Sequence, residues 1–373
     1  MTALTGATGF LGSHLLERIL RKPGDVVALV RDDGAAGWAR VETALLATGH
    51  PLPSDLRNRL RLEYADLRAP QLGMTPERYQ GLAESLSAMW HCAGMIGLLA
   101  PREELHRVNV RGTRHVLELA AAARRSPRVI HVSTAFVAGA RMHGVVQEDN
   151  LDDQYGFLTP YEESKFRAEC EVRRWAWHHE RPVLVMRPSI LLTDRPVPPG
   201  GPRHPHAVIG ARLAILTDSE RTRRLAGASP NGTLTVRLPR LPGSGNNFVQ
   251  VEYAAEAMTR LADRAPTRFV QTFHITHPRN TPSQEVADAL CRVFPWLRVD
   301  GDSLGPWIAG DSAAGARPAD RFLSVLFGGT TRYCGVGRHY DRTCLREALE
   351  DDVPDPVPIS PDYLDATFRA GLV

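Results

Sequence analysis

The sequence lacks any long hydrophobic segment. Its 373 residues contain no run of about eighteen consecutive apolar residues, the length that indicates a membrane-spanning helix. The amino terminus leads directly into a glycine-rich turn, without the charged region and following apolar region of a secretory signal. We therefore expect a soluble, cytoplasmic protein with no membrane partner.

Cysteines are few, and their spacing is typical neither of a disulfide framework nor of a metal site. There is no CxxC pair and no cysteine–histidine ligand pattern. The pairs His178–His179 and His204–His206 are not at ligand spacing either, so we expect solvated histidines and no bound metal. The five cysteines, interpreted as reduced thiols of an intracellular protein, are Cys92, Cys170, Cys291, Cys334 and Cys344.

Excess charge is also small. The net charge is +3 at pH 7, and charged residues make up 23% of the chain. This balance shows no clustered basic face of the kind that nucleic acid requires, and it excludes a disordered or fibrous chain. With 43% hydrophobic residues over this length, the chain can bury a sizeable core in one large domain or two interlocked domains.

The first half of the chain alternates short apolar runs with helical patterns. Leu11, Leu15 and Ile19, for example, recur at the spacing of one helix face. Such alternation predicts an α/β fold, a Rossmann-type doubly wound parallel sheet that binds ligands at the carboxyl ends of its strands. The predicted strands are Thr2–Thr5, Val26–Arg31, Leu60–Ala65, Ala88–Cys92, Val129–Thr134 and Val183–Arg187.

The pattern changes after Pro188. Five prolines and two glycines within residues 194–206 exclude a helix or central strand there, so we predict a loop bordering a substrate pocket. We therefore predict a dinucleotide-binding domain over residues 1–190 and 246–277, with a smaller, interleaved substrate-binding domain over 191–245 and 278–373. Further predicted elements are strands near Phe248–Val251 and Phe269–Thr276, helices near Tyr253–Arg264, Ser283–Phe294 and Pro361–Ala370, and a poorly patterned region from Gly301 to Arg338.

A glycine-rich turn, Thr5-Gly-Ala-Thr-Gly-Phe-Leu-Gly12, follows the first predicted strand and opens a helix. Glycines at this spacing permit a tight turn, close approach of a pyrophosphate and close packing of helix on strand, while the helix amino terminus supplies N–H donors. The strand before it and the helix after it provide the context that the motif needs. We predict dinucleotide binding by Gly6, Thr8, Gly9, Phe10, Leu11 and Gly12.

Arg31 ends the second predicted strand, where dinucleotide-binding folds distinguish their two nicotinamide cofactors. A cation there accommodates a 2′-phosphate, whereas an acidic residue accepts hydrogen bonds from the ribose hydroxyl. Arg31 therefore favours NADPH. Asp32 and Asp33 follow directly and leave NADH as the alternative.

A hydroxyl, a phenol and an ammonium group are expected to lie together. Tyr161 and Lys165 are four residues apart on a predicted helix, so the ammonium can lower the pKa of the phenol towards a value useful for proton transfer. Thr134 ends a predicted strand, where its hydroxyl can hydrogen-bond a substrate carbonyl near the same phenol. We predict that these three residues are catalytic.

Together the motifs resemble the extended short-chain dehydrogenase/reductase superfamily. Within it, the helix Ala39–Leu46 and the segment from Ala65 through Leu72–Met74 and Tyr79 to His91 are most similar to thioester reductases. That group includes terminal reductase domains of peptide and polyketide synthases, carboxylic acid reductases and fatty acyl-CoA reductases. The motifs are Thr5–Gly12, Ala65–Leu67, His91–Gly94, Asn109–Thr113, Val132–Thr134, Tyr161–Lys165 and Arg187–Ser189.

The resemblance implies an NADPH-dependent reduction of an acyl thioester to an aldehyde, and in some members on to an alcohol. It also implies that Asn109 is a fourth catalytic residue, which kinks its helix and ties a water to Lys165. Lys165 and Tyr161 are implied to hold the cofactor as well. Further cofactor contacts are implied as follows: Asp66 and Leu67 at the adenine, Ala93 and Gly94 at the ribose and pyrophosphate, and Pro188 and Ser189 at the nicotinamide carboxamide.

Other functions share parts of this pattern. A ketone or aldehyde reductase would use the same three catalytic residues, and a nucleotide-sugar epimerase or dehydratase has the same general fold. The helix after the second strand argues against the sugar enzymes. A non-catalytic NADP-sensing protein is the alternative of another class, although it would have no need of a proton donor.

Arginines gather between residues 203 and 240. This segment contains seven arginines but only two acidic residues, Asp218 and Glu220, and we expect it to overhang the pocket. Because such reductases often receive their substrate from acidic carrier proteins, a basic rim would attract a carrier acting in trans. A solvated face with scattered arginines is the alternative. The arginines are Arg203, Arg212, Arg221, Arg223, Arg224, Arg237 and Arg240.

Overall fold

The computed structural model describes residues 1–217, 220–225, 227–239, 243–302, 327, 329–333, 335–350 and 352–372. Asp218, Arg240, Cys334 and most of the region predicted to be poorly patterned lie outside these ranges. Among the described residues, no helix has the length and apolar character needed to cross a membrane.

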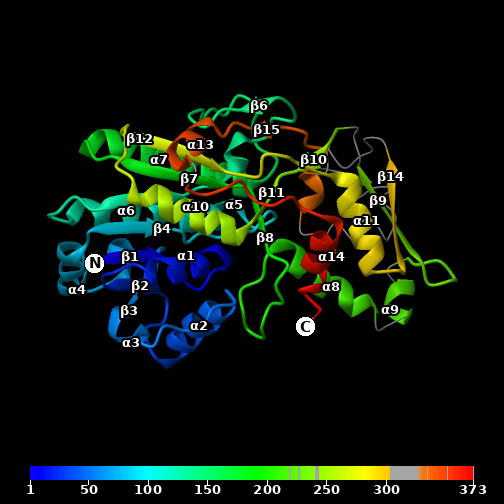
Figure 1. Cartoon of the computed structure of the whole chain (residues 1–373), viewed down its shortest axis with the longest axis horizontal. Helices are drawn as coiled ribbons and strands as arrows, with labels where there is room; N and C mark the ends of the chain where they lie inside the picture. The colour runs from blue at the N-terminus through cyan, green and yellow to red at the C-terminus, as the bar shows by residue number, and fades with distance from the viewer. Residues whose placement is uncertain are drawn as a thin grey trace.

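Seven parallel strands form the central sheet, in the order β12-β7-β5-β4-β1-β2-β3 (Figure 1). β2 and β3 follow β1 on one side, and β4, β5, β7 and β12 follow on its other side. This change of side between β1 and β4 confirms the predicted doubly wound sheet. The strands are β1 (Thr2–Thr5), β2 (Val26–Val30), β3 (Leu60–Tyr64), β4 (Ala88–His91), β5 (Arg128–Val132), β7 (Val183–Pro188) and β12 (Val270–Ile275).

Several predicted strands end earlier than expected. Arg31, Ala65, Cys92 and Thr134 were placed in strands but lie just beyond them. In β2, for example, the ladder with β3 ends at Val30, and the chain then turns away. These residues therefore stand in the loops at the carboxyl edge of the sheet, where they can reach a ligand.

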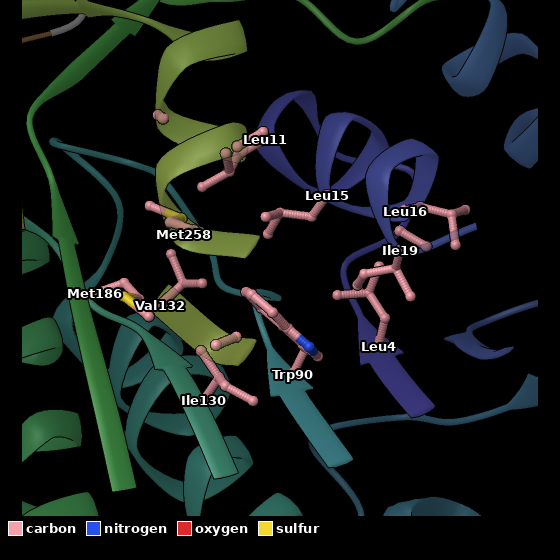
Figure 2. Packing of buried hydrophobic residues seen from close by; sticks show 14 of the residues in the cluster. Leu4, Leu11, Leu15, Leu16, Ile19, Trp90, Ile130, Val132, Met186 and Met258 are labelled. Carbon is pink, nitrogen blue, oxygen red and sulfur yellow. The ribbon is translucent and has the colours of Figure 1, made fainter. Parts of the chain in front are cut away.

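Helices cover both faces of the sheet because side chains alternate along each strand. Leu4, Trp90 and Ile130 point to the face covered by α1 and α10 (Figure 2). Ala3 and Met89 pack in the cluster on the opposite face. One layer contains α1 (Phe10–Leu20), α2 (Ala35–Leu46), α3 (Leu56–Arg59), α10 (Val251–Asp263) and α13 (Thr343–Leu349). The other contains α4 (Pro76–Ser85), α6 (Gly112–Ala122) and α7 (Pro160–His179).

A second hydrophobic cluster lies beside the sheet, on the right in Figure 1. It packs α8 (Pro205–Thr217), β9 (Leu234–Pro239), α11 (Ser283–Val293), β14 (Leu297–Asp302) and α14 (Pro361–Arg369), with α9 (Glu220–Leu225) next to α8. All of these elements fall within the predicted substrate-binding domain. Leu345, Leu349 and Val353 pack in the main cluster instead, although they were predicted to belong to the substrate-binding domain. The division into two domains stays a prediction.

Further pairs of short strands form separate two-stranded sheets. They are the pairs β8 (Ile190–Leu192) with β11 (Phe248–Gln250), β10 (Gly245–Asn246) with β13 (Thr281–Pro282), and β6 (Val145–Val146) with β15 (His339–Tyr340). Short helical segments are α5 (Arg102–Leu105), the π-helix His106–Arg111, and turns at Pro70–Gly73, Ala135–Ala138 and Thr330–Tyr333. The sequence did not predict α8, which begins at Pro205 inside the segment expected to be a loop. A helix can begin there because proline is well tolerated at the first helical position.

Candidate active site

The glycine-rich turn connects β1 to α1 at the carboxyl edge of the sheet. Gly6 has a φ of 80°, and a Cβ atom there would lie 2.7 Å from the nitrogen of Ala93. A Cβ at Gly12 would lie 1.9 Å from the carbonyl oxygen of Gly6. Side chains at these two positions would therefore clash with backbone. The glycines leave a backbone cradle at the amino terminus of α1, suited to a pyrophosphate.

A hydrogen-bond chain that the sequence did not predict fixes this cradle from below. The Thr5 hydroxyl accepts from the N–H groups of residues 92–93 and lies 2.9 Å from His91 Nδ1. Thr113 donates to the Asn109 carbonyl and so must accept from His91 Nε2, which assigns the imidazole tautomer. Burial lowers the pKa of His91 to about 3. A neutral His91 therefore joins β4 to Thr5 at the end of β1 and to Thr113 in α6.

Asn109 lies in the π-helical segment between α5 and α6, which is the kink that the resemblance implied. Its side chain accepts from the N–H of Met95 at 2.7 Å and donates to the Met95 carbonyl and to the Ser164 hydroxyl. Asn109 thus holds the loop after β4 against α7, one residue before Lys165. The predicted water link to Lys165 stays a prediction.

Tyr161 occupies the first turn of α7. Thr159 and Glu162 form a capping box at the start of this helix, and Pro160 takes its first position, so the location of Tyr161 is set locally. Burial raises the pKa of Tyr161 to about 12, although a hydrogen bond with Thr134 acts in the opposite direction. The phenol is therefore protonated at neutral pH and placed to donate a proton or a hydrogen bond.

The structure shows no hydrogen bond between the Lys165 ammonium and the Tyr161 phenol, although these two described residues were expected to lie side by side. The ammonium donates to the carbonyl of Val132 at 2.8 Å, and burial lowers the pKa of Lys165 to about 8. The expected lowering of the Tyr161 pKa by this lysine is absent from the structure, because burial dominates at the phenol. Thr134 is close by, and its hydroxyl donates to the Pro188 carbonyl at 3.5 Å. This bond is long, so the hydroxyl can turn to another acceptor at little cost.

We expect Lys165 to titrate near pH 8, losing its charge as the pH rises. The chain contains only two lysines, Lys22 and Lys165, so NMR of ¹³C-lysine-labelled protein would show two side-chain signals, and Lys22→Arg identifies which is which. A Lys165 midpoint above pH 10 would contradict the effect of burial. If the reaction requires the ammonium form, its rate falls as the pH rises through the same midpoint.

A buried ion-pair network lies beneath these residues, and the sequence analysis missed it. Glu169 follows Lys165 by one helical turn and accepts hydrogen bonds from Arg187 at 2.7 and 3.0 Å, from Arg173 and from the Ser133 hydroxyl. Burial alone would raise the pKa of Glu169, but the two guanidiniums and Ser133 outweigh it and hold the pKa well below its usual range. The i,i+4 spacing to Lys165 was the available signal.

One cavity of about 760 Å³ runs along the carboxyl edge of the sheet. The three predicted catalytic residues other than Asn109 line it, as does each predicted cofactor contact. These are Gly6, Thr8, Gly9, Phe10, Leu11, Gly12, Arg31, Asp66, Leu67, Ala93, Gly94, Thr134, Tyr161, Lys165, Pro188 and Ser189. Asn109 is instead buried behind the wall.

The cavity fits a dinucleotide on two observations. Gly6 and Gly12 lie too close to neighbouring backbone to carry a side chain. They form the tight glycine turn that a pyrophosphate site requires. At the other end of the predicted cofactor path, the Ser189 hydroxyl is buried and has no hydrogen-bond partner among the described residues, so it is available to an amide. Gly6, Gly9 and the start of α1 would hold the pyrophosphate, and Ser189 the carboxamide.

The prediction that His204 and His206 are solvated is wrong. Both histidines are buried in the cavity wall. They flank Pro205, the first residue of α8. His204 packs against Phe10, with ring centroids 5.4 Å apart.

The fold and the site define an extended short-chain dehydrogenase/reductase, a dinucleotide-binding protein with a threonine, tyrosine and lysine at the carboxyl edge of its sheet. More closely, a family described as male sterility protein matches residues 4–258, and the chain belongs to this family. This confirms the resemblance to thioester reductases.

Individual relatives agree with this assignment. The chain is 28% identical to the aldehyde reductase lnaA of Aspergillus flavus over 93% of its own length and 33% of that protein. It is also 28% identical to the carboxylic acid reductase of Mycobacterium tuberculosis, over 74% of this chain and 24% of that protein. The chain therefore spans a third or less of these curated relatives.

A solved structure is similar over nearly the whole chain. The terminal R domain from the myxalamid PKS-NRPS biosynthetic pathway superimposes with a TM-score of 0.74 at 25% identity, covering 100% of this chain and 90% of that one.

Proposed function

We propose that this protein is an NADPH-dependent reductase that converts an acyl thioester to an aldehyde and a free thiol. The observation that carries the proposal is the convergence of Thr134, Tyr161 and Lys165 on one cavity with the glycine cradle. Membership of the male sterility protein family, and the carboxylic acid reductase and terminal R domain among the similar proteins, support the thioester as substrate.

The site residues provide for this reaction as follows. Bound NADPH supplies the hydride for the thioester carbonyl carbon. Tyr161, protonated at neutral pH, and the Thr134 hydroxyl donate hydrogen bonds to the carbonyl oxygen, where negative charge develops. Transfer of the phenol proton gives a hemithioacetal, and cleavage of its C–S bond releases aldehyde and thiol. A second reduction would give an alcohol.

The test is the oxidation of NADPH with a panel of acyl-CoA, acyl-pantetheine, ketone and aldehyde substrates. Turnover of thioesters with aldehyde formation supports the proposal. Turnover of ketones alone would favour the ketone reductase, and tight NADPH binding without turnover of any substrate would favour a sensing protein.

NADPH rather than NADH is proposed because a cationic group lines the adenine end of the cavity. Arg31 has no ion-pair partner among the described residues. Arg40 also lines the cavity, and its ion pair with Asp32 is long, at 3.7 Å. Asp32 accepts from the N–H of Gly34, and Asp33 pairs with Arg78, so neither acid lines the cavity.

We expect Arg31→Ala to shrink a preference for NADPH over NADH, since a guanidinium pairs with a phosphate and loses little when only a hydroxyl is present. The measurement is the ratio of kcat/KM for the two cofactors. Arg61→Ala, on the exposed side of β3, is the control and should leave the ratio unchanged. Equal efficiency with both cofactors in the unmodified protein contradicts the proposal.

A carrier protein acting in trans stays part of the proposal, with less support from the arginine-rich segment. Arg223 donates to the carbonyls of Leu216 and Thr217 at the end of α8, and Arg224 pairs with Glu220. Two of these arginines are therefore engaged within their own part of the fold.

A further inference from the structure

The cavity has two chemically different ends. At the dinucleotide end, Arg31, Arg40 and Arg68 line it. Arg203, His204 and Asn246 line the cavity from the adjoining segments. Beyond Tyr161, at the opposite end, the described lining residues that pack in the second hydrophobic cluster or belong to β11 beside it are apolar, apart from His206. The apolar residues are Ile209, Phe248, Val286, Leu290, Phe327 and Phe368.

This apolar end is the inner surface of a packed core. Ile209, Leu290, Phe327 and Phe368 belong to the cluster that holds α8, α11 and α14 together, and each is buried. Water at this wall contacts apolar side chains, so replacing it with hydrocarbon is favourable. A polar group placed there would lose its hydration without gaining a partner.

His206 of α8 lies among these apolar residues, and its contacts keep it neutral. Its ring stacks on Phe368, with centroids 4.2 Å apart, and meets Phe248 edge-on. The Thr367 hydroxyl donates to the Leu364 carbonyl, so His206 Nδ1 must donate to Thr367. Burial lowers the pKa of His206 well below its usual value.

The thioester carbonyl has to lie between the two ends, at Tyr161 and Thr134. Phe136 and Tyr333 line the cavity beside these residues, with ring centroids 4.7 Å apart. A pantetheine arm carries amide groups that need hydrogen-bond partners, whereas an alkyl chain needs none. The apolar end therefore suits the acyl side of the thioester, and the thiol side must leave the cavity another way.

We propose that the apolar end is the acyl subsite and that it selects uncharged, aliphatic acyl groups over acyl groups with a terminal charge. The proposal rests on the proposed thioester function. A terminal carboxylate or ammonium placed against Phe368, Leu290 and neutral His206 would have no charged partner among them. Arg203 lines the cavity from the segment before α8, but its side chain is exposed.

The first test compares kcat/KM for acetyl, decanoyl and succinyl thioesters of pantetheine. We expect decanoyl to exceed acetyl and succinyl by ~10²-fold or more, since each buried methylene contributes to binding in such a pocket. Equal efficiency with decanoyl and succinyl thioesters overturns the proposal.

The second test fills the subsite. Val286 is half-buried on α11 and lines the cavity, so Val286→Trp should lower kcat/KM for the decanoyl thioester by at least ~10-fold and leave the acetyl thioester within about two-fold. Val293→Trp is the matched control, because Val293 is half-buried on the same helix and packs on the same cluster but does not line the cavity. Equal losses with both substrates, or equal effects of both variants, overturn the proposal.

A binding measurement separates this inference from the proposed function. Decanoyl and succinyl amides of aminopantetheine cannot be reduced, and their affinities can be measured by isothermal titration with NADP⁺ present. Tighter binding of the decanoyl amide, weakened by Val286→Trp, supports the subsite even if no thioester is reduced. Equal affinities overturn the subsite even if thioesters are reduced.

Discussion

Replacing Tyr161 with phenylalanine is expected to lower kcat by ~10²–10⁴-fold, the range typical of a lost general acid. The phenol is buried at the cavity wall, and burial keeps it protonated at neutral pH. Phenylalanine fills the same volume but can donate neither a hydrogen bond nor a proton to the carbonyl oxygen. The affinity for NADPH, measured by its fluorescence on binding, should change much less than kcat.

The control for this variant is Tyr155→Phe. Tyr155 is exposed in the loop before α7 and is absent from the cavity wall, so the same chemical change there should leave turnover intact. Wild-type turnover in Tyr161→Phe would remove this residue as the acid. Thr134 and Lys165 would then have to activate the carbonyl without it.

The sequence predicted the residues that line the cavity better than it predicted their electrostatics. Tyr161 and Lys165 share a helix face by spacing alone, and both line the cavity. The spacing does not reveal burial, however, which raises one pKa and lowers the other. Nor does it reveal that the Lys165 ammonium faces the Val132 carbonyl, because that contact joins two elements far apart in the chain.

The fold shows the same limit. The seven sheet strands could be predicted because each is a short apolar run between turns, and each contacts neighbours through backbone ladders. By contrast, α8 contains apolar residues on several sides, and its position depends on packing with α14 and β8. β9 and β14 pair with each other from segments about sixty residues apart, so neither has a local signal of its partner.

The largest stability effect is expected at Glu169, whose network was not predicted at all. Arg187 and Glu169 have fully buried side chains. Removing one partner of such a pair leaves the other charge buried and uncompensated, so Glu169→Gln should lower the free energy of unfolding by ~3–5 kcal/mol. Urea denaturation followed by tryptophan fluorescence measures this loss. The control is Glu171→Gln on the same helix. Glu171 pairs with the exposed Arg114 and Arg174, so this substitution should lower the free energy of unfolding by about 1 kcal/mol or less.

The pH dependence of this loss identifies its cause. The folded pKa of Glu169 is depressed below its ordinary value of 4.5, so the contribution of its charge is complete above pH 4.5 and is lost as the pH falls through the lower folded pKa. Glu169→Gln has no such titration. The difference in unfolding free energy between the two proteins should therefore be constant from pH 6 to 8 and narrow progressively below pH 4.5. A difference that stays constant down to pH 3 would mean that packing and neutral hydrogen bonds, rather than the ion pair with Arg187, hold the end of β5 and α7 together beneath the catalytic residues.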